Sequence, residues 1–361
     1  MTGTVLIVGA SGLVGTAAAI EFSDAGWTVI TASRREPELL HGLGLRHVKL
    51  DLSDPRACEA AAASLNEVTH VVYTAVFELP GLVAGWSDPV QIETNGQMLR
   101  NLLEPLRRSA KLRHVSVLQG TKAYGITIGS IRVPAREDQP RVEHPNFYWL
   151  QEDYIRATAA SDGFDFTILR PQLIVGPNHG VVMNPVPVIG IYAAIQRELG
   201  RPFAFPGGAT WVWEAADTRL VAGALRWAAE APNAAGETFN LTNGEVFSFR
   251  DMWPALAATL GVEVGPDKPL SLAEYIPAQA RTWQRVVERY ELNPLPLEKL
   301  LGESHFYADM CFAYGATVAP NPVFVSTVKI RQAGFNMSWN TEASFCDWLA
   351  DLMARRILPP A

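Results

Sequence analysis

Short apolar runs alternate with longer amphipathic stretches through the first half of the chain. Val5 to Val8 is continuously apolar, which is typical of a parallel strand buried on both faces. A glycine-rich turn and a helix ending near Asp24 follow, and a second strand is predicted from Trp27 to Ala32. The rhythm repeats, with strands predicted at residues 46–50, 70–74, 112–117 and 165–169 and helices at 55–65, 90–107 and 147–160. This alternation predicts an α/β protein with a Rossmann-type, doubly wound parallel sheet.

The rhythm fades after residue 171, where proline and glycine become frequent. Residues 238–241 predict one more strand that returns to the sheet, and from Phe249 onward the chain is mostly helical and rich in aromatic residues. The most apolar later stretch, residues 181–195, contains prolines and falls short of the roughly 20 residues of a membrane-spanning helix, so a buried helix is predicted there. We therefore expect a Rossmann domain formed by residues 1–174 and 211–243, and a smaller, mostly helical region formed by residues 175–210 and 244–361.

Composition and charge narrow the class of protein. The 361 residues are 48% hydrophobic and 19% charged, which fits a compact soluble protein with a large core. A net charge of −7 argues against nucleic acid or an anionic membrane as the main partner. The three cysteines are far apart, and neither C-x-x-C nor H-E-x-x-H occurs, so we expect no disulfide and no metal site. No secretory signal is visible, so a cytoplasmic protein is expected.

A glycine-rich loop joins the first predicted strand to the first helix. Its pattern is Gly9-x-x-Gly12-x-x-Gly15, and Ser11, Leu13 and Val14 lie between the glycines. Glycine allows the tight turn, lets the backbone approach a pyrophosphate, and lets the helix pack closely on its strand. Because the loop lies between a buried strand and a helix, it predicts a dinucleotide site. A tight turn without a ligand is the alternative.

The end of the second strand indicates which dinucleotide is bound. An NAD-selective site offers an acidic residue there to hold the ribose hydroxyl, whereas this chain has Ser33, Arg34 and Arg35. A guanidinium can bind a 2′-phosphate through two hydrogen bonds, so NADPH/NADP+ is the predicted cofactor. Two solvated basic residues are the alternative. Further cofactor contacts are expected at the ends of the third and fourth strands, at Asp51, Leu52, Thr74 and Ala75.

Tyr148 is the candidate catalytic residue, and the residue four places after it is Glu152. The chain opens in a way that resembles a short-chain dehydrogenase, whose signature is Tyr-x-x-x-Lys with the lysine one helical turn after the tyrosine. Here a lysine occurs instead at position 122, in the segment Gln119-Gly120-Thr121-Lys122 after the fifth strand. The usual lysine position is occupied by Glu152, and Lys122 is expected near the same cofactor, which indicates that a different segment supplies the catalytic lysine.

These segments, together with Asn146-Phe147-Tyr148-x-x-x-Glu152-Asp153, resemble the progesterone 5β-reductase/iridoid synthase-like enone reductases, a divergent branch of the extended short-chain dehydrogenases. The likeness continues through residues 169–176, 191–195, 239–244 and 334–335, and so covers nearly the whole chain. It implies that Tyr148 and Lys122 are the catalytic pair, and that NADPH delivers hydride to the β-carbon of an α,β-unsaturated carbonyl. The first domain would then bind NADP and the second region the substrate. We also expect cofactor contacts from Gln119, Pro171, Leu173 and Ile174.

Hydride addition at the β-carbon pushes negative charge onto the carbonyl oxygen and forms an enolate. A phenol donor such as Tyr148 would stabilise that charge, while Lys122 would favour phenolate character, hold the donor in place or bind ribose. An apolar substrate, such as a terpenoid, a steroid or a cyclic enone, would suit the apolar residues expected to cover the nicotinamide. These are Phe77, Trp86, Val186, Ile189, Phe306 and Tyr307.

Three other functions share parts of this pattern. A nucleotide-sugar epimerase or dehydratase would need Tyr-x-x-x-Lys and a serine or threonine after the fifth strand, where Glu152 and Gly120 stand. A non-catalytic NADP-sensing regulator has no need for a tyrosine–lysine pair. A carbonyl reductase shares the cofactor and the tyrosine donor, and the sequence leaves it open. The oligomeric state also stays open, with a homodimer as one option.

Overall fold

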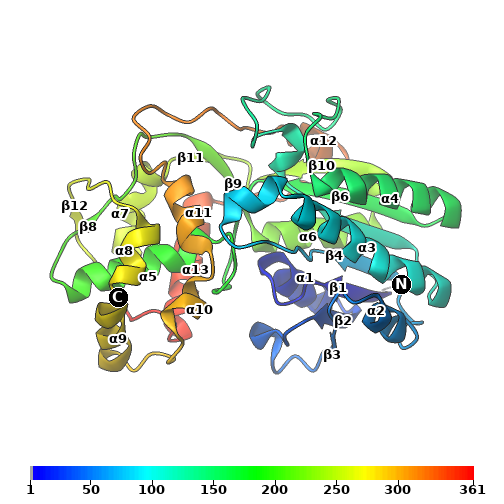
Figure 1. Ribbon diagram of the computed structural model, residues 1–361, viewed down its shortest axis with the longest axis horizontal. Helices are drawn as coiled ribbons and strands as arrows, with labels where there is room; N and C mark the ends of the chain where they lie inside the picture. Colours follow the sequence, from blue (N-terminus) through cyan, green and yellow to red (C-terminus); the bar gives the residue numbers. More distant parts are fainter. Residues whose placement is uncertain (1–2) are drawn as a thin grey trace.

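The computed structural model describes residues 3–361, except for the side chains of residues 83 and 84. Its centre is a parallel seven-stranded sheet in the order β10-β6-β5-β4-β1-β2-β3 (Figure 1). These strands are β1 (Thr4–Val8), β2 (Thr28–Ser33), β3 (Arg46–Lys49), β4 (His70–Tyr73), β5 (His114–Leu118), β6 (Asp165–Pro171) and β10 (Glu237–Leu241). The strand order reverses between β1 and β4, as in a doubly wound Rossmann-type sheet, so the predicted fold class is confirmed.

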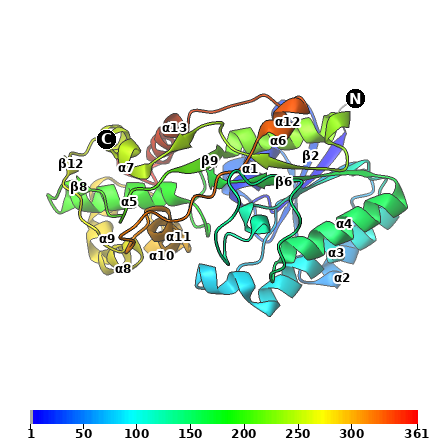
Figure 2. The ribbon, with the colours of Figure 1, turned by 90° about the horizontal axis from the view of Figure 1, so that it is seen from above.

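Helices cover both faces of this sheet. They are α1 (Leu13–Asp24), α2 (Pro55–Ala62), α3 (Pro89–Ser109), α4 (Phe147–Asp162) and α6 (Thr218–Glu230), with the short turns η1 (Glu38–Leu40), η2 (Leu82–Ser87), η3 (Thr121–Tyr124) and η4 (Pro232–Ala234). α1 and α6 share one apolar core through Phe22 and Leu220, whereas α2, α3 and α4 cover the opposite face, where Leu99 and Ile155 pack (Figure 2). Burial on both faces explains why the central strands β1 and β4 are mostly apolar, whereas β3 at the sheet edge is partly exposed and polar.

A second lobe surrounds α5 (Pro185–Glu198), which is buried along most of its length and is the buried helix that the sequence predicted. The lobe also contains α7 (Phe249–Leu260), α8 (Leu272–Ala278), α9 (Ala280–Arg289), α10 (Leu297–Leu301), α11 (Ser304–Cys311), α13 (Thr341–Ala354) and the paired strands β8 (Phe203–Ala204) and β12 (Val264–Gly265). Aromatic rings fill its core, as where Phe203 stacks on Trp253 with ring centroids 4.3 Å apart. In the described part of the chain, no helix has the length and apolar character needed to cross a membrane.

The chain passes between the two lobes more than once. β7 (Leu173–Val175), β9 (Trp213–Asp217) and β11 (Val246–Phe247) form a separate small sheet. After α11 the chain returns to the Rossmann lobe at α12 (Val328–Gln332), where Ile330 and Phe335 join the core that α1 and α6 share. The division into a cofactor domain and a substrate region stays a prediction.

Candidate active site

The glycine-rich loop lies at the carboxyl end of β1, where the strand order reverses. Gly9 has a φ of +84°, and a β-carbon there would lie 2.7 Å from the backbone nitrogen of Ala75. Glycine is therefore required for the loop to lie against the end of β4. α1 begins at Leu13, directly after Gly12, so the first turn of a helix with its free N–H groups adjoins the loop.

A groove of about 210 Å³ opens beside this loop, across the carboxyl ends of four neighbouring strands. Nine of the predicted cofactor positions line it, together with Phe77: Gly9, Ser11, Gly12, Ser33, Arg34, Asp51, Leu52, Thr74 and Ala75. This position at the reversal of a Rossmann sheet, with a backbone cradle that a β-carbon would fill, fits the adenosine side of a dinucleotide. Phe77, which the sequence assigned to the substrate pocket, lines this same groove.

Arg34 and Arg35 line different grooves. Arg34 lines the first groove, whereas Arg35 lines a second groove of about 170 Å³, between the glycine loop and the second lobe, with Asn178, Lys299 and Arg355. Ser33 does not present its hydroxyl freely, because that group donates a 2.6 Å hydrogen bond to the carbonyl of Arg35. Of the two arginines predicted at the 2′-phosphate, Arg34 is the one that lines the first groove.

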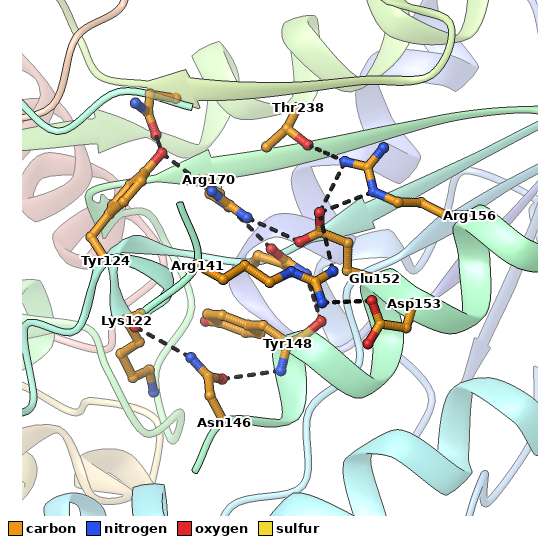
Figure 3. A network of polar contacts seen from close by, with 12 residues as sticks. Lys122, Tyr124, Arg141, Asn146, Tyr148, Glu152, Asp153, Arg156, Arg170 and Thr238 are labelled. Carbon is orange, nitrogen blue, oxygen red and sulfur yellow. Dashed lines mark hydrogen bonds and ion pairs between the residues drawn. The ribbon is translucent and has the colours of Figure 1, made fainter. Parts of the chain in front are cut away.

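The start of α4 is fixed against the loop that carries Lys122. Asn146 caps the helix, because its Oδ1 accepts a 3.0 Å hydrogen bond from the backbone N–H of Tyr148. The amide of Asn146 also donates a 3.2 Å hydrogen bond to the backbone carbonyl of Lys122 in η3. One asparagine thereby sets the spacing between the backbones of the two candidate catalytic residues (Figure 3).

The hydroxyl of Tyr148 lies against Gly120, the position where an ordinary short-chain dehydrogenase has a serine or threonine. A β-carbon on Gly120 would lie 3.2 Å from the phenol oxygen, which is closer than most carbon contacts. Tyr148 is 7% exposed, and burial, together with the charge of Glu78, raises the pKa of its hydroxyl although Arg170 opposes the shift. Burial therefore favours the neutral phenol, the form of Tyr148 that can donate a hydrogen bond.

Lys122 extends from η3 to the face of an indole ring. Its Nζ lies 4.0 Å from the centroid of the Trp86 ring, a cation–π contact with η2. Burial lowers the pKa of Lys122 to about 8, and the carboxylate of Glu78 opposes that shift. The structure thus brings Lys122 and Trp86 together, two residues that the sequence assigned to catalysis and to the substrate pocket.

Glu152 takes part in ion pairs with three arginines (Figure 3). Its Oε2 lies 3.1 Å from Nη2 of Arg170, and its Oε1 lies 2.9 Å from Arg156 and 3.5 Å from Arg141. Both Glu152 and Arg170 are buried, so each depends on the other to offset the cost of burying a charge. The position of the usual catalytic lysine therefore has a structural role in this chain.

The same arginine connects this network to Tyr148. Nε of Arg170 donates a 3.1 Å hydrogen bond to the side-chain oxygen of Gln119, and the amide nitrogen of Gln119 donates a 3.1 Å bond to the backbone carbonyl of Tyr148. Gln119, which the sequence assigned to the cofactor, is buried between them. Through Arg170 and Gln119, Glu152 thus helps to hold the backbone of Tyr148 in place.

The other predicted pocket residues lie in the second lobe. Val186 and Ile189 are fully buried in the core of the second lobe, and Tyr307 is nearly so. Phe306, one position before Tyr307 on α11, is 45% exposed. An apolar residue in a helical segment has the same sequence signal whether it faces a core or a ligand, so the sequence could not separate these cases.

Sequence reasoning missed Glu78 and the residue that holds it. Glu78 follows β4, and its Oε2 accepts a 2.8 Å hydrogen bond from the side-chain amide of Gln91 on α3. Its charge acts on both Lys122 and Tyr148. A single acidic residue after a strand is usually solvated, and nothing in the local sequence marked this one.

Comparison with known proteins agrees with this geometry. Residues 5–242 match the NAD dependent epimerase/dehydratase family. The chain is 30% identical to a 3-oxo-Delta(4,5)-steroid 5-beta-reductase of Arabidopsis thaliana, over 98% of this chain and 92% of that protein. It is 28% identical to an (S)-8-oxocitronellyl enol synthase of Antirrhinum majus, again over 98% of this chain and 92% of that protein.

Solved structures show the same fold at lower sequence identity. The Bordetella bronchiseptica enzyme WbmG in complex with NAD aligns with a TM-score of 0.67 and 16% identity, over 99% of this chain and 96% of that chain. UDP-glucose 4-epimerase of Thermotoga maritima aligns with a TM-score of 0.68 and 16% identity, over 97% of this chain and 99% of that chain. These similarities concern the fold alone.

Together, the Rossmann sheet, the glycine loop and the match over residues 5–242 define an NAD(P)-dependent protein of the NAD dependent epimerase/dehydratase family, to which this chain belongs. Within that family, the chain is an oxidoreductase of the progesterone 5β-reductase/iridoid synthase-like branch of the short-chain dehydrogenases. The resemblance inferred from the motifs around Lys122 and Tyr148 is confirmed by these full-length relatives.

Proposed function

We propose that this protein uses NADPH to reduce the carbon–carbon double bond of α,β-unsaturated carbonyl compounds. The observation that carries the proposal is the arrangement of Tyr148 and Lys122. The buried phenol of Tyr148 has its hydroxyl against Gly120, and burial favours its neutral form. Lys122 comes from η3 rather than from α4, the helix that carries Tyr148. The place of the usual relay lysine is taken by Glu152, which is engaged with Arg170. The similarity to a steroid 5-beta-reductase supports the same type of reaction.

The arrangement suits a reaction that forms an enolate. Bound NADPH would supply the hydride, and hydride addition to the β-carbon leaves negative charge on the carbonyl oxygen of the substrate. Tyr148 donates a hydrogen bond to that oxygen, and the positive charge of Lys122 stabilises the same oxygen as its charge grows. The enolate then takes up a proton from solvent at the α-carbon and becomes a saturated ketone or aldehyde. Because Tyr148 only has to stabilise the oxyanion, rapid proton delivery from a neighbouring lysine on α4 is not required.

NADPH rather than NADH is proposed from the end of β2. Arg34 lines the groove beside the glycine loop, and the strand end carries no acidic residue to hold a ribose hydroxyl. The acidic residue after β3, Asp51, is already engaged, because its Oδ1 accepts hydrogen bonds from the backbone and the hydroxyl of Ser53 at 3.0 and 2.7 Å. A guanidinium at this place favours a cofactor with a 2′-phosphate.

An apolar small molecule is the proposed substrate, bound between the cofactor domain of residues 1–174 and 211–243 and the region of residues 175–210 and 244–361. Trp86 supports this assignment, because its ring flanks the ammonium of Lys122 and adds an aromatic wall beside the reacting atoms. Terpenoids, steroids and cyclic enones share the required combination of an apolar skeleton and one conjugated carbonyl.

A matched pair of substrates tests the proposal. NADPH consumption by the purified protein is measured with cyclohexenone and with cyclohexanone, which differ only in the conjugated double bond. We expect consumption with the enone and none with the saturated ketone, and slower consumption when NADH replaces NADPH. Consumption with cyclohexanone would indicate a carbonyl reductase, and consumption with neither across a panel of enones and enals would contradict the proposal.

A further inference from the structure

One carboxylate oxygen of Glu78 is held by a hydrogen bond, whereas the other has no hydrogen-bond partner among the described residues. Its Oε2 is held by the amide of Gln91, and the oxygen of that amide accepts a 2.7 Å hydrogen bond from the backbone N–H of Leu79. Gln91 is fully buried in the first turn of α3, so the carboxyl group is fixed in place. The other oxygen, Oε1, is buried and has no hydrogen-bond partner among the described residues. A buried oxygen without a hydrogen-bond partner lowers stability, so such an atom calls for a functional explanation.

The group on which the Glu78 carboxylate can act is the ammonium of Lys122, because its negative charge favours the protonated amine. That ammonium is covered by the indole of Trp86, and water is displaced from this side of the charge. Glu78 follows β4, Trp86 lies in η2 and Lys122 lies in η3. The ring of Trp86 contacts the amine of Lys122, and the charge of Glu78 favours its protonated form, although the two charged groups form no direct ion pair in the described part of the chain. Gln91 also links the first two segments, because it bonds to Glu78 and Leu79 and its side-chain oxygen lies against Gly85, the neighbour of Trp86.

We propose that Glu78 is a positioning residue that acts as the buried counter-ion of Lys122 and keeps its amine protonated during catalysis. The proposal rests on the proposed function, in which the charge of Lys122 stabilises the enolate oxygen. An opposite charge favours the protonated amine in a site where burial favours the neutral one. The carboxylate does the same for the phenol, because its negative charge disfavours a phenolate at Tyr148. One carboxylate thereby keeps both hydrogen-bond donors of the site protonated.

The other titratable and charged groups near Lys122 are few and act differently. Tyr148 on α4 is neutral, and Arg170 on β6 acts on that phenol and favours its ionisation. His144 reaches Lys122 at its backbone carbonyl, 3.0 Å from the Nε2 of the imidazole, rather than at its amine. None of these three supplies negative charge to the amine. Loss of the Glu78 charge should therefore lower the pKa of Lys122 below its present value of about 8.

The decisive variant is Glu78→Gln, which keeps the shape of the side chain and an oxygen for the amide of Gln91. In single-turnover reduction of an enone by NADPH, we expect the alkaline fall in rate to move to lower pH by roughly one unit or more. The variant should therefore approach the wild-type rate at about pH 6 and be about fivefold or more slower at about pH 8. Glu78→Asp should lie between them, and Glu93→Gln, an exposed change on α3, should follow the wild type.

A second measurement does not depend on turnover. The protein is labelled with ¹³C at the ε-carbon of lysine, the Lys122 signal is assigned with Lys122→Arg, and its titration is followed by NMR with and without the Glu78→Gln change. A lower pKa of Lys122 in the variant supports the proposal. An unchanged titration, or a rate loss that is equal at low and high pH, overturns it. Should the wild-type protein reduce no enone while the titration still shifts, the proposed function fails and the electrostatic role of Glu78 stands.

Discussion

Oε2 of Glu152 lies 3.1 Å from Nη2 of Arg170, and both side chains are buried. Arg170 passes this contact on to Gln119, whose amide holds the backbone carbonyl of Tyr148. An ordinary short-chain dehydrogenase would place a catalytic lysine at position 152. In this chain Glu152 stands at that position and helps to hold Tyr148 in place through Arg170 and Gln119, while the candidate catalytic lysine, Lys122, comes from η3.

Restoring the common signature with Glu152→Lys should therefore damage the protein. The change would place a fourth cation beside Arg170, Arg156 and Arg141 and leave a buried charge unpaired. We expect the free energy of unfolding to fall by about 3–5 kcal/mol, measured by urea denaturation. Asp153→Asn is the matched control, because Asp153 pairs with Arg141 at 2.6 Å but is mostly exposed, so a change of about 0.5 kcal/mol or less is expected. Equal effects of the two changes would mean that the buried network contributes little.

Tyr148 and Lys122 should behave as one unit in catalysis. Tyr148→Phe removes an oxyanion donor, which typically lowers kcat by ~10²–10³, and Lys122→Ala should be similarly slow. The double variant should be little worse than the slower single variant, because the two residues stabilise the same oxygen. Steady-state kinetics gives these rates, and NADPH titration by fluorescence checks that the cofactor still binds. Near-wild-type turnover by Tyr148→Phe would mean that another group is the donor.

Much of the fold could be predicted from the sequence because the apolar runs of the parallel strands are short, regular and separated by helices. Boundaries differed by a few residues; β6, for example, extends to Pro171, and α4 ends at Asp162 rather than at residue 160. The candidate pair was found because Tyr148 and Lys122 lie in recognisable motifs. The contacts of Glu78 could not be predicted, because its burial depends on Gln91, which lies on another element.

The network around Arg170 was also out of reach of sequence reasoning. An arginine at the end of a strand is usually solvated, and its burial here depends on partners such as Glu152 and Tyr124 that are distant in the chain. Val186 and Ile189 show a second limit of sequence reasoning. Both were predicted to line a pocket, and both are fully buried in the core of the second lobe. Apolar character alone does not distinguish a core residue from one that lines a binding site.

Arg34 and Arg35 should differ in their effect on the cofactor. Arg34 lines the groove beside the glycine loop and Arg35 lines the second groove, so Arg34→Ala should raise the KM for NADPH by about tenfold or more, and Arg35→Ala by less. Activity with NADH should barely change in either variant, since NADH has no 2′-phosphate. Kinetics with both cofactors measures this. A wild-type protein that uses NADH as well as NADPH would refute the assignment of this strand end.

Glu214 on β9 should make stability depend on pH. Burial raises its pKa to about 7, while hydrogen bonds from the backbone N–H of Val325 and the side chain of Gln172 oppose the shift. Since an unfolded glutamate titrates near ~4.3, the folded protein binds this proton more tightly, and the resulting stability is lost as the pH rises through about 7.

Glu214→Gln stays neutral, so its advantage in unfolding free energy over the wild type should grow by about 1–3 kcal/mol between about pH 5 and about pH 8. Urea denaturation at the two pH values measures the change. Glu93→Gln, an exposed substitution, serves as the control and should show no such growth. An advantage of Glu214→Gln that is the same at both pH values would show that the Glu214 carboxyl does not ionise in this range.

The position that receives hydride tests the account most directly. An enone is reduced with NADPH that carries deuterium at C4 of the nicotinamide, and the label is located in the product by NMR. If the neutral phenol of Tyr148 and the charge of Lys122 stabilise an enolate, deuterium must appear at the β-carbon of a saturated ketone or aldehyde. Deuterium on a carbinol carbon would contradict the account and assign carbonyl reduction to the same site.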